Sequence, residues 1–227
     1  MEMFAGGYMQ IAIDGPAGAG KSTVAKKLSL KLNCQYIDTG AMYRATVLLA
    51  KRSGLDLTAE EAVASLANNL DFEFQNQGDI QQLLVNGVDV TEAIREPLIS
   101  QRVSQVAAFP RVRQVLVAKQ QALAASHDVV MEGRDIGEIV LPQADFKFFV
   151  TASIEIRAQR RYKELINQGF NADLDQISEE ILRRDENDQN RAQGALKQLP
   201  EAIYIDTSGK TIDQVVHELA EIIQGDG

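Results

Sequence analysis

A glycine-rich stretch at residues 10–23, QIAIDGPAGAGKST, contains the residue types with the clearest chemistry. An apolar run at residues 11–13 ends at Asp14, and Gly15 and Gly20 lie five positions apart, directly before Lys21 and Ser22. This pattern is typical of a P-loop, whose backbone N–H groups surround phosphate oxygens. Glycines permit torsions and close approaches that a Cβ forbids, and a helix that begins at Lys21 directs its positive end at the anion.

The P-loop pattern assigns roles within this stretch. Lys21 is expected to reach the β and γ phosphates of a nucleotide, and the Ser22 hydroxyl to bind Mg²⁺. A glycine-rich turn without a ligand is the alternative, but strand, loop, Lys-Ser and helix follow in the order that phosphate binding requires. The candidate nucleotide-binding residues are Gly15, Pro16, Ala17, Gly18, Ala19, Gly20, Lys21, Ser22 and Thr23.

Composition limits the class of protein. The 227 residues carry a net charge of −9, which argues against a nucleic acid or an anionic membrane as the main partner. Cys34 is the single cysteine, so no intrachain disulfide or thiolate metal site can form, and a cytoplasmic location is expected. We find no apolar run long enough to span a membrane and no secretory signal.

The hydrophobic pattern predicts an α/β fold. Helices are expected at residues 21–32, 39–52, 58–69, 97–106, 110–125, 154–168 and 178–191, and at a closing segment around 215–222. Thr58, with Glu61 three residues later, has the spacing of a capping box. Strands are expected at 11–13, 36–38, 129–131, 146–150 and 202–205. Five short strands separated mostly by helices imply a parallel sheet covered on both faces.

Residues 71–97 interrupt this alternation. Three short alternating runs at 72–74, 82–85 and 88–90 are joined by Gln77-Gly78 and Asn86-Gly87, and the second pair is a strong hairpin signal. We therefore expect a small antiparallel sheet in an inserted lobe.

Ligands of parallel sheets gather at the carboxyl ends of the strands. These ends are expected at residues 14–15, 38–39, 132–135, 151 and 206–207. The chain has no Asn-Lys-x-Asp string typical of GTPases and no apolar strand ending in Asp-Glu typical of hydrolytic motors. Instead, arginines are common at ligand-facing positions.

Four of these arginines follow predicted strands or begin a helix. Arg44 lies one turn into the helix after the second strand, and Arg134 precedes Asp135 at a strand end. Arg111 and Arg113 begin the helix opened by Pro110, where a positive charge opposes the helix dipole. A bound anion would explain such placements, but the alternative is a solvated helix arginine for Arg44 and an ordinary ion pair for the other three.

Two further groups of charges lie on predicted helices. Arg184, Asp188 and Arg191 are spaced four and then three residues apart, which places them on one helix face. The face suits a nucleotide's sugar and phosphate, although a surface ion network is the alternative. Arg157, Arg160 and Arg161 lie in a polar helix ended by Gly169, a composition that suits either a mobile flap over a phosphoryl group or a solvated helix face.

Five strings together resemble the bacterial cytidylate kinases, members of the nucleoside monophosphate kinase family. They are IDGPAGAGKST, IDTGAMYR, SQVAAFPRVR, EGRDIG and RRDENDQNR, and the inserted sheet lies between the second and the third. The resemblance runs from about Met9 to the last helix. It implies a P-loop three-layer α/β/α fold with a five-stranded parallel sheet. It also implies a core of residues 9–38, 98–152 and 172–227, an NMP-binding lobe of 39–97 and a helical lid of 153–171.

The resemblance further implies transfer of the γ-phosphoryl group of ATP to CMP or dCMP, with Mg²⁺ bound with ATP, by a cytoplasmic monomer. Catalytic roles would fall to Lys21, Arg134, Arg157 and Arg191. The acceptor would be bound by Thr39, Arg44, Ser104, Arg113, Arg134, Asp135, Arg184, Asp188 and Arg191. Among these, Arg44, Arg134 and Arg191 would bind the phosphate, Ser104, Arg113 and Asp135 the cytosine, and Arg184 and Asp188 the ribose.

Two positions depart from some relatives without losing the functional group: Thr39 stands where they have Ser, and Glu132 where they have Asp. A kinase of the same fold acting on UMP or another monophosphate is one alternative. A nucleotide-binding switch protein without acceptor chemistry is the other, and the missing guanine motif argues against it.

Overall fold

A computed structural model describes residues 7–77, 80–167 and 169–225. Its central sheet has five parallel strands in the order β2-β6-β1-β7-β8, so the strand that leads into the P-loop lies in the middle. The strands are β1 (Gln10–Asp14), β2 (Gln35–Asp38), β6 (Val129–Gly133), β7 (Phe146–Thr151) and β8 (Ile203–Asp206). The expected five-stranded α/β fold is thereby confirmed.

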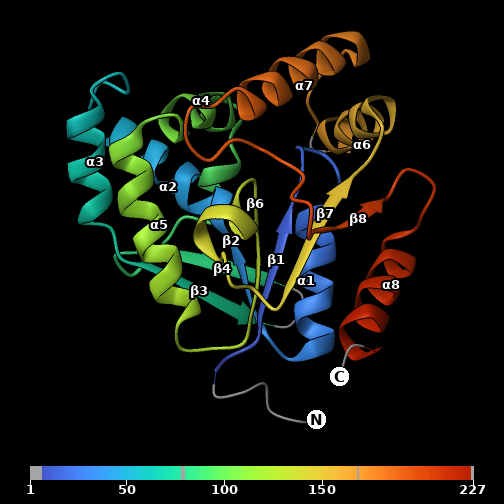
Figure 1. Ribbon diagram of the computed structural model, residues 1–227. Coiled ribbons are helices and arrows are strands. Elements are labelled where there is room, and N and C mark those ends of the chain that lie inside the picture. The colour runs from blue at the N-terminus through green and yellow to red at the C-terminus, as the bar shows by residue number, and fades with distance from the viewer. Residues whose placement is uncertain (1–6, 78–79, 168, 226–227) are drawn as a thin grey trace.

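Helices cover both faces of this sheet (Figure 1). On one face, α1 (Lys21–Leu32) and α8 (Ile212–Gly225) bury Val24, Leu28 and Leu219 against β1 and β7. The opposite face is covered by α2 (Thr39–Arg52), α4 (Pro97–Ala107) and α5 (Pro110–Ala124), with α3 (Glu60–Asn68) packed outside them. Each of these helices carries apolar side chains at helical spacing, and burial of that apolar stripe stabilises the helix.

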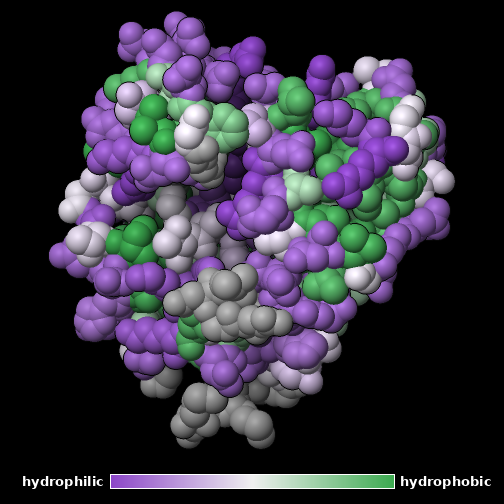
Figure 2. Space-filling model, turned by 180° about the vertical axis from the view of Figure 1, so that it is seen from behind, coloured by the Kyte–Doolittle hydropathy of each residue, from purple (hydrophilic) through white to green (hydrophobic). Residues whose placement is uncertain are grey.

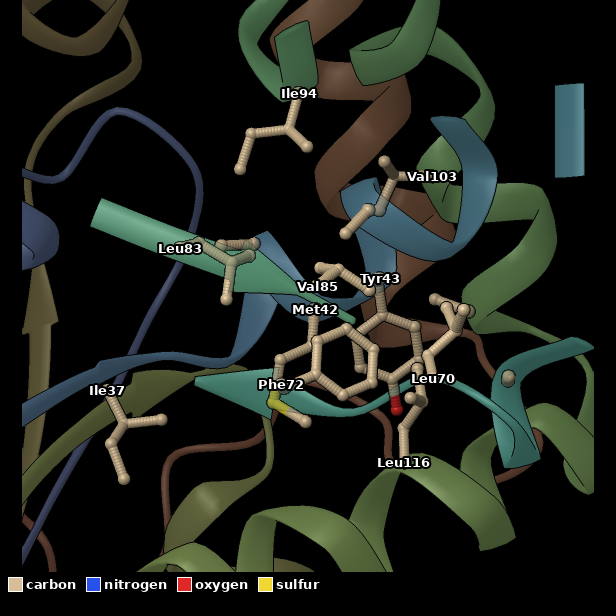
Figure 3. Close-up of a cluster of buried hydrophobic side chains, with 14 of the residues drawn as sticks. Ile37, Met42, Tyr43, Leu70, Phe72, Leu83, Val85, Ile94, Val103 and Leu116 are labelled. Atoms are coloured by element: carbon tan, nitrogen blue, oxygen red, sulfur yellow. The ribbon is translucent and has the colours of Figure 1, made fainter. Parts of the chain in front are cut away.

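The inserted sheet shares the core of the α2–α5 side. Strands β3 (Phe72–Gln77), β4 (Ile80–Val85) and β5 (Val88–Asp89) are antiparallel, and the η1 turn (Ala93–Arg95) follows. Asn86 and Gly87 both have positive φ, 51° and 76°, as the expected hairpin turn requires. The turn expected at Gln77-Gly78 lies partly outside the described residues. Figure 3 shows side chains of this sheet, α2, α4 and α5 pointing toward one another.

One expected helix start is wrong. The third helix begins at Glu60, and its N-cap is Ala59 without a side-chain hydrogen bond, so Thr58 and Glu61 form no capping box. The Asp56 carboxylate accepts the Thr58 N–H at 2.8 Å, while Glu61 pairs with Arg111 of α5 at 2.8 Å. A tertiary ion pair has displaced the local cap.

The two helices that follow β7 were expected at residues 154–168 and 178–191. Helix α6 (Ile154–Asn167) is close to its prediction, but α7 spans Leu174–Gln189 rather than 178–191. Asp173 caps α7 early by accepting the Gln176 N–H at 2.9 Å, and Arg191 lies beyond the helix end. A π-helical turn, η2 (Ile136–Val140), follows β6 and was not expected.

Within the described residues, no helix is long and apolar enough to cross a bilayer.

Candidate active site

The carboxyl ends of all five parallel strands meet at one edge of the sheet. In the registers, Asp14 lies beside Gly133 on one neighbour and Phe149 on the other, and Asp38 lies beside Glu132. The P-loop therefore lies between the ends of β6 and β7, with α6 and α7 nearby (Figure 1). Seen from behind, hydrophilic side chains line a recess in the upper half of the molecule (Figure 2).

Glycine is required in the P-loop for two reasons. Gly15 has φ +149°, and a Cβ there would lie 1.9 Å from the carbonyl oxygen of Val150. Gly20, the N-cap of α1, is in the left-handed region with φ 89°. Both conformations are ones that other residues rarely adopt.

Four consecutive P-loop carbonyl groups accept hydrogen bonds from side chains. Pro16 accepts from Lys21 Nζ at 2.8 Å, and Ala17 from Arg157 Nη1 at 3.2 Å. Gly18 accepts from Arg160 Nη1 at 3.5 Å, and Ala19 from Thr207 Oγ1 at 3.0 Å. Strand ends and α6 thus hold the loop in a fixed conformation, as a phosphate cradle needs.

Lys21 is buried among cations. Burial lowers the pKa of its ammonium to about 7, and the charges of Arg134 and Arg184 lower it further than the carboxylate of Glu132 raises it. Its amine therefore lies close to a cluster of arginines outside the P-loop, which includes Arg134 and Arg184. An anion placed between them would favour the charged form of the lysine.

The exposed Ser22 lies beside the buried pair of Tyr36 and Glu132. The Tyr36 hydroxyl donates to Glu132 Oε1 at 2.7 Å and also interacts with the Ser22 side chain. Burial, together with the charges of Glu132 and Asp38, raises the pKa of Tyr36 well above its ordinary value, so the phenol stays a donor. The Ser22 hydroxyl is a suitable ligand for a Mg²⁺ ion that is bound mainly by nucleotide phosphates, and the Glu132 carboxylate adds negative charge nearby.

Arg134, Asp188 and Arg191 form the centre of the arginine cluster. Asp188 accepts from Arg134 Nε at 2.8 Å and from Arg191 Nη2 at 2.5 Å. Burial alone would raise the pKa of Asp188, but the two arginines outweigh it and the pKa is lowered. Asp188 therefore holds both guanidinium groups in place as an ionised carboxylate.

Arg184 is a half-buried cation whose positive charge is not fully balanced by neighbouring carboxylates. Its Nε has no hydrogen-bond partner among the described residues. Burial, followed by the charge of Arg134, lowers its pKa to about 10, and Arg44 also contributes. Because unpaired buried charge is costly, a cluster of this kind is stabilised by an anion. Arg184 therefore adds to the positive charge of the cluster that contains Arg134 and Arg44.

Arg113 and Asp135 form a buried ion pair. Arg113 also donates to the Tyr43 hydroxyl at 3.4 Å. Burial raises the pKa of Asp135 despite the neighbouring arginine. A Cβ at Gly194, whose φ is +65°, would lie 2.4 Å from Asp135 Oδ2, so the loop after α7 closes tightly over the pair.

The remaining expected acceptor residues lie around this centre. Arg44 pairs with Asp38 at 2.6 Å, and the buried Thr39 donates to the carbonyl of Glu132 at 2.7 Å. Ser104 is half-buried on α4, and in the described part of the chain no hydrogen bond joins it to the others. Arg111 is an exposed surface cation paired with Glu61, so the ion-pair alternative is the correct one for it.

The arginines of α6 differ in their surroundings. Arg157 is buried, pairs with Asp185 at 2.7 Å and binds the carbonyl of Ala152, so it joins the P-loop to α7. Arg160 binds Thr207 at 2.8 and 3.0 Å. Arg161 pairs with Glu164 at 2.8 Å and is near enough to Arg184 to contribute to its lowered pKa.

Sequence reasoning missed Asp14 as a functional side chain. Its two oxygens accept the N–H groups of Ile136 and Gly137, each at 2.8 Å, and so join the start of the P-loop to the segment after Asp135. Its position at the end of the first predicted strand could have indicated that role. Tyr36 and Asp185, by contrast, gave none, because only the fold reveals their partners.

Together, the phosphate cradle and the neighbouring cationic cluster on an α/β/α sheet define a P-loop kinase. A solved structure of an uncharacterized protein from Eubacterium ventriosum has the same fold, with a TM-score of 0.53, 12% identity and coverage of 95% of this chain and 98% of that chain.

The cytidylate kinase family model matches residues 11–225, so the chain belongs to the cytidylate kinase family and is an ATP-dependent nucleoside monophosphate kinase. The chain is 51% identical to the cytidylate kinase of Symbiobacterium thermophilum over 210 residues, which is 92% of this chain and 93% of the relative. It is 46% identical to that of Leuconostoc mesenteroides over 215 residues, 95% and 96% of the two chains. The resemblance of the five sequence strings is thereby confirmed.

Proposed function

We propose that this enzyme transfers the γ-phosphoryl group of ATP to CMP or dCMP, giving ADP and CDP or dCDP. The observation that carries the proposal is the contact between the two halves of the site: Asp14, at the start of the P-loop, lies beside Gly133 and binds the segment after Asp135, so Arg134 and its partner Asp188 adjoin the phosphate cradle. A donor triphosphate on the P-loop and an acceptor phosphate on the arginines would then adjoin each other.

On the donor side, the P-loop N–H groups and Lys21 bind the triphosphate of ATP. The Ser22 hydroxyl would hold Mg²⁺ together with ATP oxygens, and Glu132 behind Tyr36 would support it. When bound, the ion would neutralise charge on the β and γ phosphates.

On the acceptor side, Arg44, Arg134 and Arg191 bind the phosphate of CMP. Arg184 and Asp188 are placed for the ribose. A guanidinium suits phosphate because two of its N–H groups match two oxygens.

Asp135 and Arg113 select the base. Cytosine has an exocyclic amine donor where uracil has a carbonyl acceptor, so a carboxylate favours cytosine. Arg113 supplies donors for the acceptor atoms of the ring. In the described structure each of these two side chains satisfies the other, so binding would exchange a protein ion pair for contacts with the base.

The chemical step needs no side-chain base, because the CMP phosphate is already anionic at neutral pH. One of its oxygens attacks the γ-phosphorus, the bond to the β-phosphate oxygen breaks, and ADP leaves with the electron pair. The protein contributes alignment and charge neutralisation through Lys21 and the arginines.

We expect residues 153–171, which contain α6, to act as the lid, and α6 packs against α7. They share a small apolar cluster of their own, Ala158, Ile177 and Ile181, apart from the two larger cores. Closure of such a unit would exclude water, which otherwise competes for the phosphoryl group.

The test is a coupled assay of ADP release with CMP, dCMP, UMP and AMP, using the wild type and Asp135→Ala. We expect CMP and dCMP to be preferred over UMP, and the variant to lose about tenfold or more of that preference. Equal use of CMP and UMP by the wild type would overturn the cytosine assignment. Retained discrimination in the variant would reject the role of Asp135.

A further inference from the structure

A small cavity lies between the start of α2 and the inserted sheet. Its polar lining comes from Asp38, Arg44, Gln81, Thr91 and Arg95. Arg44 and Asp38 belong to the sheet edge at which the acceptor is proposed to bind. Arg95, at the end of η1, comes from the inserted segment instead. The cavity therefore joins the acceptor site to the inserted segment at residues 71–97, none of whose side chains has been assigned to the acceptor.

The charges around this cavity do not balance. Asp38 is paired with Arg44 at 2.6 Å. No described residue forms an ion pair or a hydrogen bond with the exposed Arg95 side chain. By contrast, Arg113, Arg134 and Arg191 each have a carboxylate partner. The cavity lining thus has two guanidinium groups and one carboxylate, and that carboxylate is paired with Arg44.

The backbone that carries Arg95 is firmly held. Ile94 is 3% exposed and points into the hydrophobic cluster (Figure 3), and its N–H donates to the carbonyl of Val90 at 3.0 Å. Thr91 Oγ1 accepts the Leu83 N–H at 2.9 Å. The buried Ile94 thus fixes the backbone next to Arg95, so the fold places Arg95 and Arg44 on the lining of the same cavity.

We propose that Arg95 is a further acceptor-binding residue, whose guanidinium binds a phosphate oxygen of the nucleoside monophosphate from the side of the inserted sheet. This rests on the proposed function. Arg44 connects the two regions, because its charge also contributes to the lowered pKa of Arg184 in the acceptor cluster. The η1 turn that follows the inserted sheet then has a direct part in substrate binding, because it supplies a further cation.

The test compares Arg95→Ala, Arg95→Lys and, as a matched control, Arg52→Ala, which removes an exposed arginine from the far end of α2. Calorimetry would measure the Kd of CMP, of cytidine and of ATP, and steady-state assays the KM for CMP. Cytidine is the decisive probe because it lacks the phosphate.

For Arg95→Ala we expect the Kd and KM of CMP to rise about 10- to 100-fold, the loss typical of a charge-assisted hydrogen bond, while the Kd of cytidine and of ATP changes less than about twofold. Arg95→Lys should recover part of the CMP affinity, and Arg52→Ala should match the wild type. Unchanged CMP affinity in Arg95→Ala, or equal weakening of CMP and cytidine, would overturn the role of Arg95.

The same measurements distinguish the two proposals. If the wild type neither binds nor phosphorylates CMP, the proposed function itself fails. If the wild type uses CMP and Arg95→Ala binds it equally well, only the assignment of Arg95 fails. A thermal melt of each variant shows whether a change in affinity comes from unfolding, and Arg95→Gln replaces the alanine variant if that one is unstable.

Discussion

Lys21 shows how the charge of one residue depends on the nucleotide. Burial and two neighbouring arginines favour its neutral form, which places its pKa at about 7. A triphosphate would favour the charged form and raise the pKa. Near pH 7, where about half of the lysines are neutral, ATP binding should therefore take up about half a proton per site.

Calorimetry of ATP binding in buffers of different ionisation enthalpy measures this uptake. Lys21→Arg supplies the control, because a guanidinium remains protonated throughout. The wild type should take up more protons than the variant at pH 7, and the difference should shrink toward pH 6. The same uptake in both proteins would contradict the lowered pKa.

Some residues of the site could be predicted from the sequence because their signal is local. The P-loop glycines, Lys21 and Ser22 form a short motif, and Arg134 and Asp135 follow directly after a buried strand. Asp185 had no such signal, since its pairing with Arg157 depends on the packing of α6 on α7.

At the scale of elements, Asp14 links β1 to η2. Its carboxylate is 6% exposed, and burial raises its pKa to about 6 although two N–H groups stabilise the ionised form. The folded state therefore binds a proton on Asp14 more tightly than the unfolded chain does between about pH 4 and 6. Its contribution to stability consequently falls as pH rises through this window.

Asp14→Asn tests this link, because asparagine has a similar shape and does not titrate. Denaturant unfolding at several pH values gives the free energy of each protein. The wild-type value minus the variant value should fall by about 3 kcal/mol between pH 4 and pH 7, since a shift of two pKa units corresponds to that amount. A difference that does not vary with pH would contradict the account.

Element boundaries were predictable where the stop signal is in the backbone itself. Helix α1 ends before Asn33, which has φ 56°, and the β4–β5 hairpin turns at Asn86 and Gly87. Prediction failed where side chains form contacts with residues that are distant in sequence. Glu61 binds Arg111, fifty residues away in sequence, rather than completing a local cap, and no window of sequence contains that competition.

At the scale of the whole molecule, the distribution of charge matters more than its sum. The chain has a net charge of −9, yet Lys21 and the arginines at positions 44, 134 and 184 form one electrostatic cluster, and Arg191 joins it by sharing Asp188 with Arg134. The parallel sheet makes this possible by bringing strand ends from distant parts of the chain to one edge. The inserted sheet and the α6–α7 pair flank that edge, where each can supply further cations.

The central claim is that a donor triphosphate and an acceptor monophosphate lie side by side, and transfer of label tests it most directly. The enzyme would be incubated with ATP labelled in the γ-phosphate, with and without CMP, and the products separated. The account predicts that the label appears in CDP, one for each ADP formed, and that little ATP is consumed without CMP. Release of the label as inorganic phosphate at a rate that CMP does not change would contradict it.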